Sequence, residues 1–384
     1  MVKFSSFATV VAATSIFLAA NAHPGHSIEE EIAERAAYLK RGISNLDHCA
    51  ERLRARGHEK RSIGRRVAKI QELRDEVAHK KSSLARRQTA TSAMPPGSGA
   101  PSGAMCSGAA PSGGAGGADG GENITDFGVS VANASHLSNL TVDPWTTEVD
   151  SIIYGNSSCI LNPEGEIGPY YVQGEGEFVR HDITETQPGV PIYLEEQFIT
   201  VNTCEPITGL YSDIWLCNST GVYAGVVANG NGNSDDASNI NATFLRGIQK
   251  TDSDGVAAWR SVFPGYYSGR ATHIHMVTHT NATLLSNGTI TGGTDLIDYI
   301  NDNVFPYTLN TITLTTNAED RVFITETDTN SDPVLNYVLL GDKVEDGLFA
   351  WITIGVDPSA EYTTEAASVL TEDGGYATGN TDVV

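Results

Sequence analysis

The sequence predicts an all-β protein: a β-sandwich core of short mixed strands, preceded by a separate helical N-terminal segment. Short runs rich in Val, Ile, Thr and aromatic residues alternate with clusters of Gly, Asn and Asp, as in strands joined by turns. The length of 384 residues and the 40% hydrophobic content are sufficient for one large domain. The predicted strands are Val190 to Val201, Leu210 to Leu216, Val256 to Phe263, Ala271 to His279 and Leu348 to Ile354.

Residues 1–22 are predicted to be a secretory signal peptide. Lys3 supplies the positive start, and the apolar run from Phe7 to Ala20 is too short to span a membrane easily. Ala20-Asn21-Ala22 fits the small-x-small cleavage rule. The alternative is a buried N-terminal helix. A signal peptide predicts a secreted, extracellular protein whose mature form has no membrane segment.

Residues 23–87 are predicted to be helical. Ser27 and Glu30 fit a capping box, and apolar residues then recur at alternating steps of four and three until Arg56-Gly57-His58 breaks the pattern. The pattern resumes at Ile63, which indicates a helical hairpin. Dibasic pairs punctuate this segment at Lys40-Arg41, Lys60-Arg61, Arg65-Arg66 and Arg86-Arg87. One interpretation is a pro-segment removed after Arg87, and the other is an ordinary helical domain with a basic surface.

The remaining chain is divided by composition. Residues 88–122 are rich in Gly, Ser, Ala and Pro, which predicts a flexible linker. The β-sandwich domain is assigned to residues 123–357, with a possible short helix near Asp295 to Val304. Residues 358–384 are predicted to be a loose acidic tail.

The charge distribution argues against a nucleic-acid partner. The formal net charge is −23, and residues 88–384 carry 7 Lys and Arg against 37 Asp and Glu. Binding of phosphate needs clustered cations, which that part of the chain lacks. The opposite balance, 16 Lys and Arg against 10 Asp and Glu, is confined to residues 23–87.

Two further features agree with secretion. Eight Asn-x-Ser/Thr sequons predict N-linked glycans, at Asn123, Asn133, Asn139, Asn156, Asn218, Asn241, Asn281 and Asn287. The five cysteines, Cys49, Cys106, Cys159, Cys204 and Cys217, form no CxxC pair. In an oxidising compartment a disulfide among the last three is expected, and the pairing cannot be read from the sequence.

The stretch from Phe263 to Met276 is the most informative for chemistry. His273 and His275 are two residues apart on a predicted strand, so both imidazoles lie on one face and form a candidate metal pair. A hydrogen-bonded or surface pair is the plainer interpretation. His279 is a weaker candidate on the same face.

Two tyrosines strengthen the metal interpretation. Tyr267 follows a Pro-Gly turn six residues before His273, and Tyr223 ends the Gly-Val-Tyr sequence that follows the Asp213-Ile214-Trp215 strand. A phenol has a pKa near 10, so phenolate ligation at neutral pH requires a strongly acidic metal such as Fe(III).

These motifs resemble those of the intradiol ring-cleaving catechol and protocatechuate dioxygenases, most closely the secreted fungal type. The resemblance covers roughly Cys159 to Thr280 and continues more weakly to about Val356. The matching elements, in chain order, are Gly168-Pro169-Tyr170-Tyr171-Val172, Asp213-Ile214-Trp215 with Gly221-Val222-Tyr223, Thr251-Asp252-Ser253-Asp254-Gly255, Pro264-Gly265-Tyr266-Tyr267, and Arg270 with His273-Ile274-His275.

The resemblance implies a non-haem Fe(III) held by Tyr223, Tyr267, His273 and His275. Its substrates would be a small aromatic diol and O₂, and its product a muconate-type diacid. It also implies that Tyr267 accepts a substrate proton and that Arg270 stabilises developing negative charge beside the ring. For Arg270 the alternative is a surface ion pair.

Gly168, Pro169 and Tyr170 match a segment that borders the substrate cavity in this family, and a plain structural turn is the alternative for them. The oligomeric state is left open.

The chain also departs from the family pattern. A glutamine-containing strand often follows the His-x-His motif, but Leu296 to Val304 contains no glutamine, and Asp298 is a loose candidate for its place. Leu216 stands where relatives commonly have a polar residue. The missing glutamine motivates an alternative to the dioxygenase: a secreted iron-binding glycoprotein that keeps the fold but serves as a binding or surface module.

Overall fold

The computed structural model describes ten stretches of the chain: residues 45–91, 124–138, 158–161, 170–174, 178–228, 231, 236–280, 283–327, 331–360 and 366–379. The predicted signal peptide and nearly all of the predicted linker lie outside the described residues. So do Cys106, Gly168 and Pro169.

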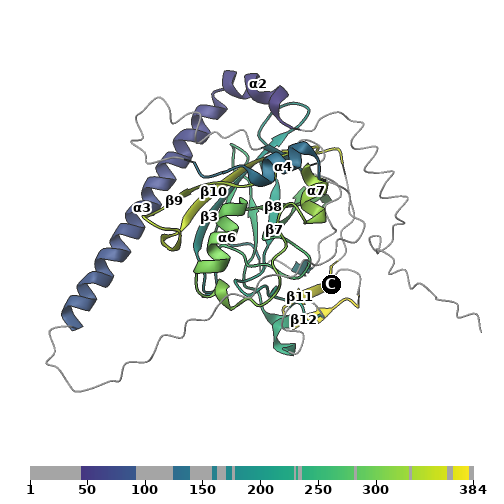
Figure 1. Cartoon of the computed structure of the whole chain (residues 1–384). Coiled ribbons are helices and arrows are strands. Elements are labelled where there is room, and N and C mark those ends of the chain that lie inside the picture. Colours follow the sequence, from purple (N-terminus) through teal and green to yellow (C-terminus); the bar gives the residue numbers. More distant parts are fainter. Residues whose placement is uncertain are drawn as a thin grey trace, which may run out of the picture.

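The described strands form three sheets (Figure 1). The first has the order β1-β10-β3-β6, with β9 also paired to β10; the second is β5-β4-β7-β8; and the third is β12-β11-β2. The first sheet is mixed, because β10 runs parallel to β1 and β3 but antiparallel to β9. The strand bounds are β1 Ser158–Ile160, β2 Val172–Gly174, β3 Pro191–Thr200, β4 Tyr211–Trp215, β5 Arg246–Lys250, β6 Val256–Val262, β7 His273–Thr280, β8 Thr283–Thr291, β9 Asn336–Leu339, β10 Leu348–Val356, β11 Ser368–Thr371 and β12 Gly374–Ala377.

The five predicted strands are confirmed as β3, β4, β6, β7 and β10, each within a few residues of its expected bounds. The strands that the sequence pattern missed are mostly short or poor in hydrophobic residues. β1 and β2 have three residues each, and β8 reads Thr-Leu-Leu-Ser-Asn-Gly-Thr-Ile-Thr.

The first two sheets share one hydrophobic core. Leu194 and Phe198 of β3 are fully buried in it, together with Ile214 of β4 and Ile274 and Met276 of β7. Because side chains alternate along a strand, the intervening residues of β4 and β7 face the other side of their sheet. That outer face of the second sheet is where the candidate site lies.

Five α-helices are described alongside the sheets. Their bounds are α2 Ala50–Ala55, α3 His58–Thr91, α4 Asp126–Asn133, α6 Thr294–Asn303 and α7 Arg321–Thr327, with 3₁₀ turns at Asp47–Cys49, Ala237–Asn241, Tyr307–Leu309 and Val344–Asp346. The predicted helix near Asp295 is confirmed as α6, and Leu296, Ile297 and Ile300 bury its apolar side in the shared core. Among the helices that the structure describes, none has the length and apolar character to cross a membrane.

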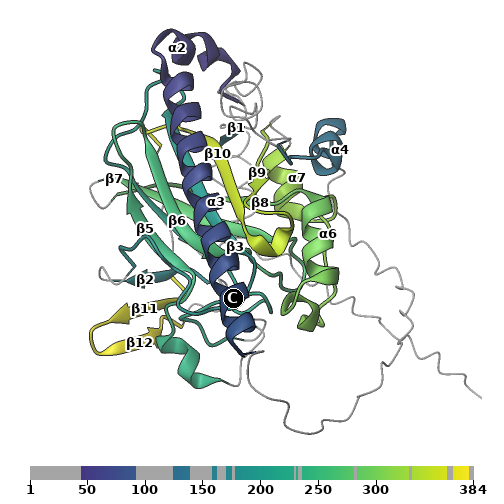
Figure 2. The same ribbon diagram turned by 90° about the vertical axis from the view of Figure 1, so that its left-hand side faces the viewer.

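The N-terminal helical segment is not separate from the sheets, which corrects the expectation from sequence. Helix α3 lies along the face of the first sheet (Figure 2), and the break between α2 and α3 falls at Gly57, as predicted. Ile70 and Leu73 of α3 pack against Phe349 and Trp351 of β10. The apolar residues that recur along α3 form a stripe on one side of the helix, and this stripe packs against the sheet.

Two more expectations are corrected. The predicted disulfide among Cys159, Cys204 and Cys217 is wrong: Cys204 pairs with Cys49, 155 residues away, and both Cys159 and Cys217 are buried free thiols. Within the predicted loose tail, Ser368–Thr371 and Gly374–Ala377 instead form a β11–β12 hairpin that pairs with β2. Ser368 anchors this hairpin, because its hydroxyl donates a hydrogen bond to the Gly225 carbonyl.

Candidate metal centre

The two histidines of β7 face one another on the outer side of the second sheet. Their Nε2 atoms are 2.9 Å apart, and both rings are buried. Nδ1 of His273 lies 2.6 Å from the Ala271 carbonyl oxygen, which can only accept a hydrogen bond. The proton of the neutral His273 ring is therefore on Nδ1, and Nε2 keeps its lone pair directed at the space shared with His275.

Burial keeps both imidazoles in the form that binds metals. Desolvation, followed by the Arg270 charge, lowers the pKa of His273 to about 3. Desolvation and the neighbouring His273 hold the pKa of His275 well below its ordinary value. Neither ring is protonated at neutral pH, so both can offer a nitrogen lone pair.

Tyr223 comes to the histidines from the loop after β4. Its hydroxyl oxygen is 3.4 Å from Nε2 of His273, and its side chain is fully buried. Two buried asparagines hold its backbone. Asn231 accepts from the Tyr223 N–H at 2.7 Å, and both Asn231 and Asn239 donate to the Tyr223 carbonyl, at 2.9 Å and 2.8 Å. The backbone N–H and carbonyl of Tyr223 therefore both have hydrogen-bond partners inside the protein.

Glycines in the tyrosine motifs allow the two loops to touch. Gly221 has a φ of +86°, and a Cβ there would collide with the Tyr266 carbonyl oxygen. A Cβ on Gly265 would lie 2.6 Å from the Asn218 carbonyl oxygen. The Gly-x-Tyr and Pro-Gly-x-Tyr turns are therefore packed backbone to backbone, which places both tyrosines beside one another.

Tyr267 completes the group of four. Its ring meets the rings of Tyr223 and His273 edge to face, with centroid distances of 5.5 Å and 5.4 Å. Nη1 of Arg270 lies 3.4 Å from the Tyr267 hydroxyl oxygen. The structure thus brings Tyr223, Tyr267, His273 and His275 together, from two loops and one strand.

The phenol of Tyr223 needs a cation in order to ionise. Burial raises its pKa well above the ordinary value of 10, and the neighbouring Cys217 and Tyr267 add to this. Without a cation the hydroxyl stays protonated across the physiological range. A donor set of two phenols and two neutral imidazoles fits a strongly Lewis-acidic ion, since phenolate oxygens are hard anionic ligands.

Two aromatic rings cover the group. Trp215 of β4 stacks on His275 with a centroid distance of 5.1 Å and an angle of 9°. Tyr170 stacks on Tyr223 at 4.6 Å and has a positive φ of 65°, which is uncommon for a bulky residue. Arg246 holds it there by donating to the Tyr170 carbonyl oxygen at 2.6 Å. Tyr170 therefore lies against the site, whereas its sequence neighbours Gly168 and Pro169 lie outside the described residues.

Arg270 is buried and does not form the surface ion pair considered from sequence. Its Nε is 3.1 Å from both carboxylate oxygens of Asp320, which also accepts the Ala271 N–H at 2.8 Å. Burial by itself would raise the pKa of Asp320, but the Arg270 charge holds it below its ordinary value. Asp320 begins helix α7 by accepting the Val322 N–H at 2.8 Å. An Asp before a short helical run is a common N-cap, and this was the available sequence signal for Asp320.

Two other candidates lie away from the group. Nε2 of His279 is 3.7 Å from a carboxylate oxygen of Asp213. Asp298 is exposed on α6, whose opposite side packs in the shared core, so it does not take the place of the missing glutamine. The sequence analysis did not identify three residues that support the site, Asn231, Asn239 and Arg246. Their side chains bind backbone groups that are distant in the sequence, and no local pattern marks such residues.

A second cluster with metal-binding residue types is not a metal site. His48, Cys49 and Cys204 lie close together, but the two sulfurs are joined in the disulfide and carry no thiolate. Nε2 of His48 is 2.7 Å from the Val201 carbonyl oxygen. This cluster attaches the N-terminal segment to the sheet.

The described fold and site define a mostly β protein with a buried pair of histidines and a pair of tyrosines on one sheet face. Among solved structures, the chain is similar to intradiol ring-cleavage dioxygenases, the family that its motifs resemble. An intradiol ring-cleavage dioxygenase from Tetranychus urticae is 26% identical, with 53% of this chain and 98% of that chain covered and a TM-score of 0.46.

A dioxygenase domain from Streptomyces sp. SirexAA-E, part of a fusion with a carbohydrate-binding protein, is 20% identical. The match covers 52% of this chain and 98% of that domain, with a TM-score of 0.35. Hydroxyquinol 1,2-dioxygenase from Pseudomonas putida DLL-E4 is 16% identical, with 52% and 65% covered and a TM-score of 0.30. No family model and no curated protein matches the chain.

Proposed function

We propose that this chain is a secreted, non-haem Fe(III) intradiol dioxygenase that cleaves catechol-type aromatics with O₂ to muconate-type diacids. The observation that carries the proposal is the convergence of Tyr223, Tyr267, His273 and His275 in one buried group. The shared core of the first two sheets supports the β-sandwich that we infer as its scaffold. The spaced sequence motifs of the dioxygenase family contribute these same four residues.

The four side chains would hold the ion through two phenolate oxygens and two imidazole nitrogens. Two negative ligands offset most of a trivalent charge, and the low dielectric of the buried site strengthens that attraction. When bound, ferric iron would supply the Lewis acidity that ionises the phenols and a diol and makes the diol reactive toward O₂.

The surrounding residues have separate tasks in this proposal. Tyr267, ionised while it serves as a ligand, would accept a proton from the incoming diol and become a neutral phenol. The Arg270 guanidinium, 3.4 Å from its oxygen, would donate a hydrogen bond to that oxygen. Arg270 would stabilise negative charge that develops beside the ring, and Asp320 fixes its orientation. Tyr170, which stacks on Tyr223, would border the bound substrate on that side of the group.

Secretion is supported by the Cys49–Cys204 disulfide, since such crosslinks form and persist in oxidising compartments. The sequons are not equivalent as sites for glycans. Asn133 is exposed on α4, whereas the Asn218 side chain accepts from the N–H groups of Thr220 and Val222 inside a turn. We therefore expect a glycan at Asn133 and none at Asn218.

The test is oxygen uptake by the iron-loaded protein with catechol, hydroxyquinol and protocatechuate, combined with visible absorption spectroscopy. We expect uptake with at least one diol and a visible band from tyrosinate bound to Fe(III). Tyr223→Phe and Tyr267→Phe should each weaken and shift the band, while Tyr299→Phe, an exposed residue of α6, should leave it unchanged. The band without oxygen uptake would favour the rival iron-binding module, and a colourless protein with full iron content would contradict both.

A further inference from the structure

The N-terminal segment is fixed to the β domain by three kinds of contact. The disulfide joins Cys49 to Cys204. Arg65 and Arg66 of α3 reach one carboxylate, that of Glu195 on β3, at 3.1 Å and 2.7 Å, and the Arg66 side chain has no exposed surface. The apolar stripe of α3 covers Phe349 and Trp351. If the segment left, a buried charge would be unpaired and a large apolar face exposed.

The dibasic pairs differ in their accessibility to a protease. Lys40-Arg41 lies outside the described residues. Arg66 is buried against Glu195, so Arg65-Arg66 is closed to a protease. Lys60 and Arg61 are exposed, but they lie near the start of α3, where Arg61 bonds Asp254 at 2.9 Å. Arg86 and Arg87 are both exposed.

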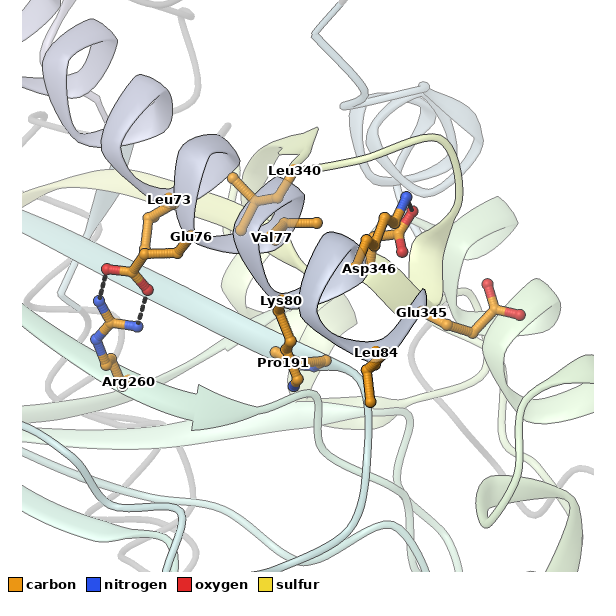
Figure 3. A pocket seen from close by; sticks show the side chains of 11 residues that line it. Leu73, Glu76, Val77, Lys80, Leu84, Pro191, Arg260, Leu340, Glu345 and Asp346 are labelled. Carbon is orange, nitrogen blue, oxygen red and sulfur yellow. Dashed lines mark hydrogen bonds and ion pairs between the residues drawn. The ribbon is translucent and has the colours of Figure 1, made fainter. Parts of the chain in front are cut away.

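The position of the last pair on α3 explains this exposure. A groove runs between α3 and the sheet, and two ion pairs cross it. Glu76 of α3 accepts from Arg260 of β6 at 2.8 Å and 3.0 Å (Figure 3). Lys81 of α3 bonds Asp346 at 2.8 Å. Leu84 is the last α3 residue in this groove and is half exposed. Beyond it the end of α3 reaches past the strands (Figure 1).

We propose that Arg86-Arg87 is a processing site and that the cleaved N-terminal segment stays attached to the β domain as a second, disulfide-linked chain. A dibasic-specific endoprotease of the secretory pathway would hydrolyse the Arg87–Gln88 amide. One water is consumed, Arg87 gains a carboxylate and Gln88 gains an amino group. The site is within the last turns of α3, and helix ends open readily into the extended form that proteases bind. The inference rests on the proposed secretion but not on the dioxygenase activity.

Attachment after cleavage follows from where the contacts lie. The disulfide, the Glu195 ion pairs and the apolar packing all lie on the N-terminal side of Arg87 and connect to the β domain directly. None of them depends on the Arg87–Gln88 bond. The segment is thus a permanent part of the protein, unlike a pro-segment that leaves on maturation.

The test is intact mass and N-terminal sequencing of the full chain secreted from a eukaryotic host. We expect one species in denaturant without reductant, and two chains after reduction, one of them beginning at Gln88. The double variant Arg86→Gln/Arg87→Gln should give one chain in both conditions, whereas Lys60→Gln/Arg61→Gln should still be cleaved. In the Cys49→Ser/Cys204→Ser variant, denaturant alone should separate the chains.

Two results would overturn the inference. One is a single chain after reduction that still begins near His23, which would mean that no cleavage occurs. The other is a protein that begins at Gln88 and releases no fragment on reduction, which would mean that the segment is lost. Oxygen uptake by the uncleaved variant separates these outcomes from a failure of the dioxygenase proposal.

Discussion

Asp320 binds Arg270 at the edge of the histidine–tyrosine group: Nε of Arg270 lies 3.1 Å from each of the two Asp320 carboxylate oxygens, which accept its hydrogen bond. The same carboxylate accepts the Ala271 N–H, and Ala271 in turn accepts from His273. One acidic residue therefore fixes both the guanidinium that approaches Tyr267 and the backbone that fixes a histidine.

Asp320→Asn should lower kcat by roughly 10- to 100-fold while iron content and the visible band are largely retained. The amide keeps the size of the side chain but cannot hold the Arg270 charge in place, and small misplacements of a charged group are costly to catalysis. Steady-state oxygen uptake measures kcat and KM separately. Asp302→Asn, on the exposed side of α6, is the control. Loss of iron together with kcat would assign Asp320 a structural role instead.

Gly221→Ala should destabilise the protein and impair iron binding. The methyl group meets the Tyr266 carbonyl, and the positive φ is unfavourable for any residue with a Cβ. Gly57→Ala is a matched control, because Gly57 has a φ of +66° but its added Cβ would lie 3.8 Å from the nearest atom. We expect Gly57→Ala to cost about 1 kcal/mol of unfolding free energy and Gly221→Ala clearly more. Denaturant titrations with equal m-values would check this, and equal losses would contradict the clash.

Glu196 should make the protein less stable as pH rises. It is fully buried on β3, bonded to Ser212 at 2.8 Å, and burial raises its pKa to about 8. The folded state therefore binds a proton that the unfolded state releases above its ordinary pKa. This contribution to stability is complete below about pH 4.5 and is lost as pH rises towards 8, on the order of a few kcal/mol.

Glu196→Gln keeps the neutral hydrogen-bonding group and removes the titration. Thermal unfolding at pH 4, 6 and 8 should show a variant that gains in Tm over the natural protein as pH rises. Glu372→Gln, at an exposed position, should show no such trend. A constant difference across this pH range would mean that Glu196 does not control the slope.

Arg66→Met should destabilise the docking of α3. The variant leaves Glu195 buried, and although Arg65 still reaches it, loss of one partner of a buried ion pair typically costs about 3–5 kcal/mol. Arg66 also lies 5.5 Å from the Trp351 ring centroid, a contact that would be lost. Arg54→Met breaks the exposed Arg54–Glu59 pair and should change the free energy of unfolding by less than about 1 kcal/mol. Similar losses in both variants would show that burial does not strengthen the α3 pair.

Much of the local structure could be predicted from the sequence. The five apolar strand runs and helix α6 were found because burial leaves a periodic pattern of side chains along each element. The break at Gly57 followed from a residue that adopts positive φ readily. The β11–β12 hairpin was missed, because it is stabilised mainly by pairing with the distant β2 and its own residues are mostly small or polar.

The sequence by itself identified the four candidate ligands. Alternation on a strand places His273 and His275 on one face, and the motifs shared with the dioxygenase family mark Tyr223 and Tyr267. Only the tertiary structure decided what surrounds them. Three sets of contacts join residues up to 155 positions apart: the Arg270–Asp320 ion pair, the hydrogen bonds from asparagines to the Tyr223 backbone, and the Cys49–Cys204 disulfide. Such contacts leave no periodic trace, because a single polar residue or thiol is satisfied by whatever the fold brings within a few ångströms of it.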